Sequence, residues 1–170
     1  MEVRGYKAFK SDLKNKYGKP FEMNVVYSKD PDKLKFGENG SGFHMTAKLA
    51  DTFRFFNPCL DNVYCEVIGS GKVVQQDDYL YDSDTMYVVE KIKIVKVLSR
   101  QDIFQYVCQA DEAEFRRCLA LFPFTKEELA QLRLVVIEKG IIYEELFQNA
   151  MKYQNGDLAS FKRNSEYLRR

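Results

Sequence analysis

The chain has 170 residues, of which 45% are hydrophobic, and a formal net charge of +1. That length suits one domain, or one domain with an appended subdomain, and it allows a sizeable buried core. The near-neutral charge excludes an overall field that would attract nucleic acid or an anionic membrane. No apolar run approaches the roughly 18 residues of a membrane span, and the charged start of the chain lacks the apolar stretch of a signal peptide. We therefore expect a cytoplasmic protein without direct contacts to membranes or nucleic acid.

The first forty residues combine strand patterns with turns. Residues 3–9 and 21–27 are predicted as two strands, separated by a lysine-rich segment that ends at the breakers Gly18 and Pro20. Residues 28–42 are polar and glycine-containing, which predicts a long surface loop. Thr46 is then predicted to cap a short helix, which is apolar at Leu49, Phe53 and Phe56.

Two further strand patterns follow. The first covers residues 63–68, after which Gly69-Ser70-Gly71 predicts a turn into residues 72–74. Residues 77–84 are acidic and contain tyrosines, which predicts a loop or hairpin tip. Residues 86–98 carry the strongest strand pattern, and its apolar phase shifts at Val95, which indicates a bulge or burial on both faces.

From Ser99 onward the pattern is helical. Three segments with apolar residues at helical spacing are each preceded by a predicted N-cap: Ser99, Asp111 and Thr125. Further segments of this kind follow Gly140. Strands followed by helices indicate the α+β class. We predict a small, mainly antiparallel, curved β-sheet with one short helix, followed by a C-terminal bundle of short helices. The β-rich domain would cover residues 1–98, and residues 99–170 would form a helical subdomain packed on it.

Several short motifs in order carry a family resemblance. They read G-Y-K-A-F at residues 5–9, G-F-H and an aromatic helix at 42–56, V-Y-C-E-V-I-G at 63–69, K-V-V at 72–74 and E-K-I-K-I-V-K-V-L-S at 90–99. Residues 1–100 thereby resemble an uncharacterised domain family found mainly in phages and other mobile elements. Members often carry a cysteine just before G-F-H, where this chain has Ser41. The resemblance implies an origin in a mobile element, and it implies no activity.

A fainter similarity is to ADP-ribosyltransferase-like folds. These place an Arg or His on an early strand, a Ser or Thr after a Gly-aromatic turn, and a Glu on a late strand. The similarity would assign these catalytic positions to Arg4, Thr46 and Glu90, in an enzyme that uses NAD. A glutamate can steady an oxocarbenium-like state and an arginine can bind pyrophosphate. Thr46 as a helix cap and Glu90 as a polar strand residue are the structural alternatives.

His44 is the only histidine in the sequence. Together with Cys59, Cys65 and one carboxylate such as Asp61 it could bind zinc, although the spacing of the two cysteines is wider than that of most zinc ligands. A structural histidine beside Phe43 is the simpler interpretation. The cysteines form no C-x-x-C pair, which favours reduced thiols. We expect no metal and no cofactor.

Surface residues suggest a binding function. Phe55 cannot face inward together with Phe53 and Phe56 on one helix, so it is expected to be exposed or to touch the helical tail. The acidic tip offers exposed tyrosines among carboxylates, which suits a basic protein partner, although a solvated tip is the alternative. Its candidate partner-binding residues are Asp77, Asp78, Tyr79, Tyr81, Asp82 and Asp84.

The expected function is inhibition of a host defence factor in the host cytoplasm, as by an anti-CRISPR protein, with a nucleic-acid-handling nuclease as one candidate partner. An ADP-ribosyltransferase-like enzyme and a structural zinc protein are the alternatives.

Overall fold

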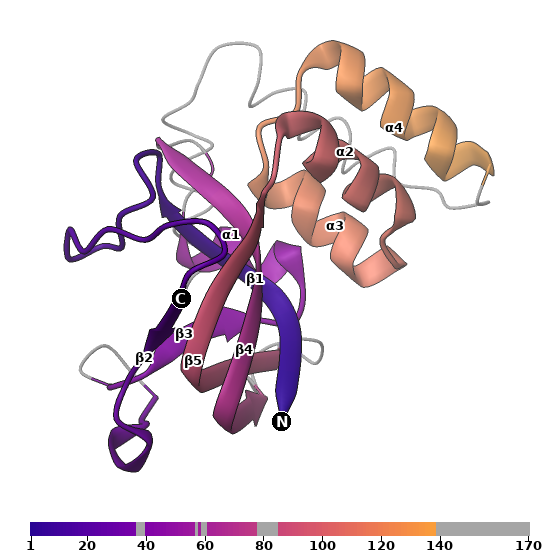
Figure 1. Cartoon of the computed structure of the whole chain (residues 1–170). Helices are drawn as coiled ribbons and strands as arrows, with labels where there is room; N and C mark the ends of the chain where they lie inside the picture. Colours follow the sequence, from indigo (N-terminus) through magenta and orange to yellow (C-terminus); the bar gives the residue numbers. More distant parts are fainter. Residues whose placement is uncertain (37–39, 57, 59–60, 78–84, 139–170) are drawn as a thin grey trace. The chain divides into compact units, whose positions relative to one another are not determined.

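A computed structural model describes residues 1–36, 40–56, 58, 61–77 and 85–138. The chain divides into two compact units. The first contains Met1–Thr52 and Asp61–Leu98, and the second contains Phe53–Leu60 and the chain from Ser99 onward. Each unit is described below by itself (Figure 1).

The first unit is an antiparallel sheet of five strands. The strands are β1 (Glu2–Lys10), β2 (Val26–Ser28), β3 (Phe43–Thr46), β4 (Asn62–Asp77) and β5 (Thr85–Val97). β5 pairs with β3, β3 with β1, β1 with β4, and β4 again with β5, so these four strands close a ring. β2 pairs with β5 along the same edge of that strand as β3 does. The predicted α+β class and the mainly antiparallel, curved sheet are confirmed.

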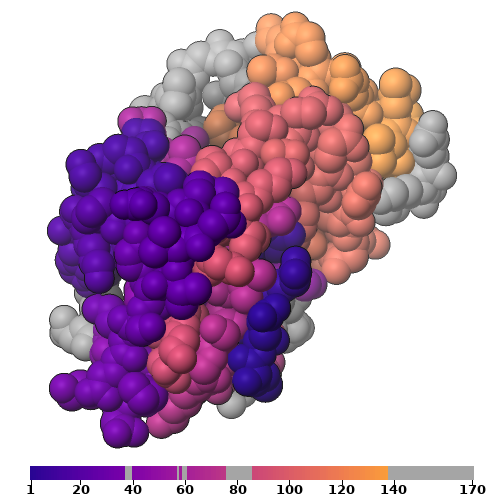
Figure 2. Space-filling model, in the orientation of Figure 1, coloured from indigo at the N-terminus to yellow at the C-terminus, as the bar shows by residue number. Residues whose placement is uncertain are grey.

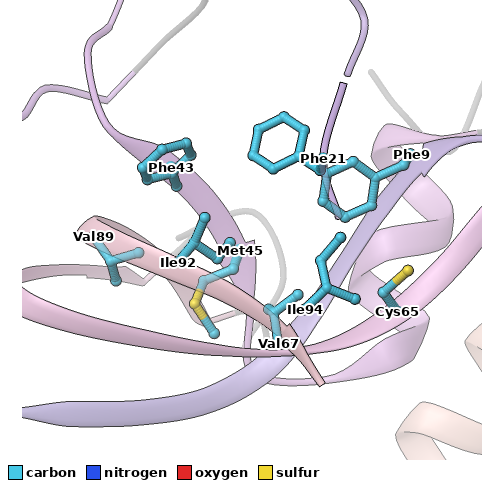
Figure 3. Close-up of a cluster of buried hydrophobic side chains, with 9 residues drawn as sticks. All are labelled: Phe9, Phe21, Phe43, Met45, Cys65, Val67, Val89, Ile92 and Ile94. Atoms are coloured by element: carbon cyan, nitrogen blue, oxygen red, sulfur yellow. The ribbon is translucent and has the colours of Figure 1, made fainter. Parts of the chain in front are cut away.

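The inner face of this sheet holds an apolar core (Figure 3). Phe21 packs against Phe9 and Phe43 with ring centroids 5.1 and 6.1 Å apart. Because side chains alternate along a strand, Phe43 and Met45 of β3 enter this core while their neighbours face outward. The core contains Phe9, Phe21, Phe43, Met45, Cys65, Val67, Val89, Ile92 and Ile94.

The backbones of β1 and β3 lie very close together at Gly5. A Cβ atom on Gly5 would lie 2.2 Å from the carbonyl oxygen of Thr46, so only glycine fits there. The registered pairing of these two strands is confined to Tyr6 opposite Thr46. The two strands therefore meet closely at one point, beyond which β3 no longer pairs with β1.

Two irregularities shape the long hairpin of β4 and β5. The chain does not turn at Gly69–Gly71, so that prediction is wrong; β4 continues through a bulge between Ser70 and Val73. Gly71 has φ +78° there, which glycine adopts without strain. A second irregularity leaves Val95 without a partner between the pairs Val67–Ile94 and Glu66–Lys96. It confirms the bulge expected from the phase shift in β5.

The connections between the strands differ in part from the prediction. Of the second predicted strand, residues 21–27, only Val26 and Tyr27 lie in β2 (Val26–Ser28), and Met23 forms an isolated bridge to Ile94. In its described residues, the polar loop contains one short 3-10 helix, η1 (Pro31–Lys33). The predicted short helix is α1 (Leu49–Phe55). Thr46 is not its cap, because it is the last residue of β3 and lies too far before the helix.

The second unit contains helices α2 (Arg100–Gln109), α3 (Glu112–Leu121) and α4 (Lys126–Glu138). All three predicted caps are confirmed. Ser99 and Asp102 form a capping box, the Asp111 carboxylate accepts from the Glu114 N–H, and Thr125 and Glu128 cap α4 reciprocally. Phe122 packs between Phe53 and Phe124, with ring centroids 5.2 and 4.8 Å away. The helices predicted after Gly140 lie outside the described residues.

Candidate functional site

The three residues suggested by the ADP-ribosyltransferase similarity lie on three strands. Arg4 is exposed on β1. Thr46 is buried, and its hydroxyl contacts the Thr52 hydroxyl at 2.6 Å and donates to the Lys48 carbonyl at 2.9 Å. On β3 and β5, Thr46 pairs with Met86, four residues from Glu90, which is about 13 Å along a strand. The structure therefore does not bring Thr46 and Glu90 together.

Glu90 closes the bulge in β4. Its carboxylate accepts a hydrogen bond from the Lys72 N–H at 2.9 Å and lies 3.5 Å from the Lys91 amine. The Lys72 N–H is the main cause that holds the pKa of this carboxyl below its usual range. The group thus has a structural contact in the fold, and its catalytic role stays a prediction.

The candidate zinc ligands His44 and Cys65 face opposite sides of the sheet. Cys65 points into the core, where burial raises the pKa of its thiol to about 12. His44 lies between the core residues Phe43 and Met45 on β3, so alternation turns its ring outward. Cys59 lies outside the described residues. Within the part of the chain that the structure describes, no three His, Cys, Asp or Glu side chains could hold a metal ion together.

The predicted partner-binding residues fall at two places. Asp77 ends β4 opposite Thr85, and the tip residues Asp78, Tyr79, Tyr81, Asp82 and Asp84 lie outside the described residues. Phe55 ends α1 with 45% of its surface exposed, and the Arg54 guanidinium lies 5.2 Å from its ring centroid. An exposed aromatic side chain can join a protein interface, and its role as a contact stays a prediction.

A polar group missed by the sequence analysis lies where β1 and β3 separate. The Lys7 amine donates a hydrogen bond of 2.7 Å to the carbonyl oxygen of His44. The register of Tyr6 opposite Thr46 would place Ala8 opposite His44, but no such pair forms. Lys7 therefore satisfies a carbonyl that the strand ladder leaves without its partner.

Both titratable groups at this point are shifted toward their neutral forms. Burial, together with the nearby charge of Lys16, lowers the pKa of Lys7 to about 8. Burial, with the charges of Lys7 and Lys16, lowers the pKa of His44 to about 4. The Nε2 atom of His44 is buried without a hydrogen bond from any described residue, and the Phe36 ring lies edge-on to the imidazole at 6.1 Å.

One feature of the sequence could have indicated the cluster of Lys7 and His44. Val3, Gly5, Lys7 and Phe9 share the inward phase of β1, so a lysine stands where an apolar residue is expected. Perturbed titratable groups that gather in this way often mark functional sites. The partners of Lys7 could not be found from its own surroundings, because His44 is 37 residues away in the chain.

A second candidate surface is the outer edge of β2. β2 ends the sheet, and no second described strand pairs with it. The Lys29 N–H donates to the Glu90 carbonyl at 2.9 Å, which turns the backbone of Tyr27 and Lys29 toward β5. The N–H and C=O groups of Val26 and Ser28 then point to the edge. Figure 2 shows this part of the chain, in violet, on the molecular surface.

Apolar side chains surround that edge. Val26 is 55% exposed, and its chain neighbours Val25 and Met23 are 39% and 36% exposed. Lys93 pairs with Val26 and Lys91 pairs with Ser28, so both lysines lie on the same face as their partners. The edge combines hydrogen-bonding backbone, apolar side chains and positive charge.

Comparisons with known proteins give a family but no described activity. None of the helices in the described part of the chain is both long enough and apolar enough to cross a membrane. No curated protein and no solved structure matches the chain. The family described as "Domain of unknown function (DUF7666)" matches residues 3–106, which include the five strands except for Glu2 of β1, and the first turns of α2. The chain belongs to the DUF7666 family.

Proposed function

We propose that this protein is encoded by a phage or another mobile element and inhibits a host defence factor by protein–protein contact in the host cytoplasm. Its action would resemble that of an anti-CRISPR protein. The observation that carries the proposal is the open edge of β2, where Val26 is 55% exposed. The phage origin is supported by the motif resemblance of residues 1–100.

The β2 edge suits the addition of one extended strand. A partner strand would pair with the outward N–H and C=O groups of Val26 and Ser28, as in β-strand addition. The exposed part of the Val26 side chain would be removed from water at about 25 cal/mol per Å². Natural proteins usually protect such edges with charge or keep them very short, and β2 is only three residues long. A short edge favours a regulated contact over aggregation.

The charges near β2 indicate the chemistry of the partner. Lys91 and Lys93 lie one strand away from the edge and Lys29 follows β2 directly. An added strand with acidic side chains would face these amines, and charge complementarity would raise its association rate. A nucleic-acid-handling nuclease is the partner class that we propose. Phe55 and the acidic residues 77–84 would be additional contacts, with the acidic segment directed toward a basic surface of the nuclease.

The test is capture of the partner from host lysate with three forms of the protein. These are the wild type, Val26→Lys, and Val97→Lys as a matched control at another half-exposed strand valine. We expect a nuclease to be identified by mass spectrometry with the wild type and Val97→Lys, and its affinity for Val26→Lys to fall at least about tenfold. Equal affinity of all three forms would show that the β2 edge is not the contact surface. Failure of the wild type to bind any defence protein would remove the proposed function.

A further inference from the structure

The two sides of β2 differ in chemistry, and the difference bears on which strand could be added to its edge. Tyr27 faces the core, because its ring centroid lies 4.6 Å from that of Phe21. The Lys29 N–H bonds to the Glu90 carbonyl, so the alternation of side chains continues one residue beyond β2. Tyr27 and Lys29 therefore lie on one side, the inner side of β2.

Two amines lie over aromatic rings on this inner side. The Lys19 amine, from the connection between β1 and β2, lies 5.9 Å from the centroid of the Tyr27 ring. The Lys29 amine lies 6.0 Å from the centroid of the Phe43 ring. Both lysines are exposed, so both amines are accessible to a partner.

Carboxylates close in the chain do not pair with these amines. The acidic residues on either side of β2 are Glu22, Asp30 and Asp32. Within the described residues, none of them and no other carboxylate forms an ion pair with Lys19 or Lys29. Asp30 is paired instead with the last residue of η1, at 3.2 Å. An acidic side chain of a partner would therefore meet two amines that lack a paired carboxylate.

The outer side of β2 offers a different contact. Val26 is 55% exposed there and lies opposite Lys93 on β5. Lys91, opposite Ser28, already has a carboxylate beside it, because its amine lies 3.5 Å from Glu90. An apolar side chain on this side could pack against Val26 and against the methylene stem of Lys93, whose amine reaches water.

We propose that the strand added to β2 alternates acidic and apolar residues, with the acidic side chains on the inner side, beside Lys19 and Lys29, and the apolar side chains on the outer side, beside Val26. Side chains that face each other on adjacent strands lie about 5 Å apart at Cβ, and diagonal neighbours about 7–8 Å apart. An acidic residue opposite Tyr27 is then within reach of both amines. This pattern depends on the proposed function, because it describes the segment through which the partner would bind.

The backbone of β2 favours a protein segment over a nucleic acid as the bearer of these charges. The outward N–H and C=O groups of Val26 and Ser28 pair with another extended peptide backbone, which a nucleic-acid strand does not have. A peptide strand also presents two chemically different sides, one to each side of β2. The charge then selects among protein segments and favours acidic ones.

The experiment measures the binding of short, capped, fluorescent peptides to the purified full chain by fluorescence anisotropy. Glutamate and valine alternate in the first peptide, lysine and valine in the second, and glutamate and threonine in the third. We expect the glutamate–valine peptide to bind at least about tenfold more tightly than the lysine–valine peptide, and its affinity to fall as salt is added. It should also bind more tightly than the glutamate–threonine peptide, which has less apolar surface to bury. Equal binding of either of the other peptides would overturn the proposal.

Matched pairs of substitutions test on which side the acidic residues lie. Lys19→Gln with Lys29→Gln removes the inner amines, and Lys91→Gln with Lys93→Gln removes two outer amines. We expect the inner pair to weaken binding of the glutamate–valine peptide by about fivefold or more, and the outer pair by less than about twofold. Circular dichroism checks that both proteins are folded. Equal losses, or a larger loss from the outer pair, would overturn the assignment of sides.

Val26→Lys tests whether the peptide binds at the β2 edge. It should abolish binding of the glutamate–valine peptide, and undiminished binding would overturn the proposal. The outcome is separable from the capture experiment. A nuclease captured from lysate, together with no preference among the peptides, would retain the proposed function and refute the alternating pattern. The expected peptide preference, without any captured defence protein, would refute the proposed function and retain the pattern.

Discussion

The hydroxyl oxygens of Thr46 and Thr52 lie 2.6 Å apart, and both side chains are buried. Thr46 also donates to the Lys48 carbonyl, so its hydroxyl joins the end of β3 to the start of α1. If one of two buried hydrogen-bonded hydroxyls is removed, the other stays buried without a partner, and its desolvation penalty lowers the free energy of unfolding. This contact gives Thr46 a structural role, and its catalytic role stays a prediction.

We predict that Thr46→Val lowers the free energy of unfolding by about 1–3 kcal/mol. Thr46→Ser keeps the hydroxyl and should cost only about 1 kcal/mol for the lost methyl group. Urea unfolding followed by circular dichroism measures both. If Thr46→Val were as stable as the wild type, the hydroxyl would not be a structural link, and a ligand-directed role would regain support.

Binding of NAD provides the corresponding test of the enzyme alternative. Millimolar NAD is expected to leave the melting temperature unchanged, because the Thr46 hydroxyl and the Glu90 carboxylate are held by Thr52 and Lys72. Thermal shift with and without NAD measures this. A rise in melting temperature that disappears in Glu90→Ala would favour the ADP-ribosyltransferase-like alternative.

The bulge at Gly71 predicts a second stability difference. A Cβ atom on Gly71 would lie 2.4 Å from the Glu90 carboxylate, in a backbone conformation with φ +78°. Gly71→Ala should therefore be more destabilising than Gly18→Ala, where φ is +83° but no atom lies within 4 Å. The control isolates the cost of the left-handed backbone, about 1–2 kcal/mol. Equal losses in the two variants would show that Glu90 moves aside without cost.

His44 predicts a pH dependence of stability. Its pKa is about 4 in the folded protein and near 6.5 in an unfolded chain, so the unfolded state binds more protons between these values. The free energy of unfolding should then rise with pH from about 4 to 6.5. After allowance for solvent screening, we expect a contribution on the order of 1–2 kcal/mol.

His44→Gln is the variant that isolates this contribution. Other groups titrate in the same range, so the quantity to measure is the difference in unfolding free energy between wild type and His44→Gln at each pH. That difference should change in favour of the wild type as the pH rises through the window. A difference that stays constant from pH 4 to 7 would mean that His44 is protonated as easily when folded as when unfolded.

In the helical unit, replacing Arg100 by lysine tests how much hydrogen-bond geometry contributes to stability when the charge is kept. Its guanidinium donates two hydrogen bonds to Glu128, at 2.7 and 2.8 Å, and one to the Pro123 carbonyl at 2.7 Å. Arg100→Lys keeps the charge but not the paired donors, so about 1 kcal/mol of stability should be lost. Lys33→Gln, which breaks a single exposed contact with Asp30, should change stability by less than about 0.5 kcal/mol. Equal effects of both changes, measured by urea unfolding, would contradict the prediction.

The sequence predicted the local elements of the second unit well. Ser99, Asp111 and Thr125 are caps as expected, because a cap is formed by residues within three positions of one another. The strands β1 and β5 were predicted for the same reason, since alternation is visible within one segment. The local rule failed at Gly69–Gly71, because pairing with β5 carries β4 straight through a glycine-rich segment that reads as a turn.

The amino-acid sequence by itself determined the α+β class, most element positions, the caps of α2, α3 and α4, and the family. The tertiary structure alone decided that four strands close a ring, that Lys7 holds the carbonyl of His44, and that Thr46 is a buried link instead of a cap. The physical reason is the range of the interactions. Caps and alternation depend on neighbours in the chain, whereas the pairing of β1 with β3 and of β4 with β5 brings distant residues together and sets which polar groups lose water.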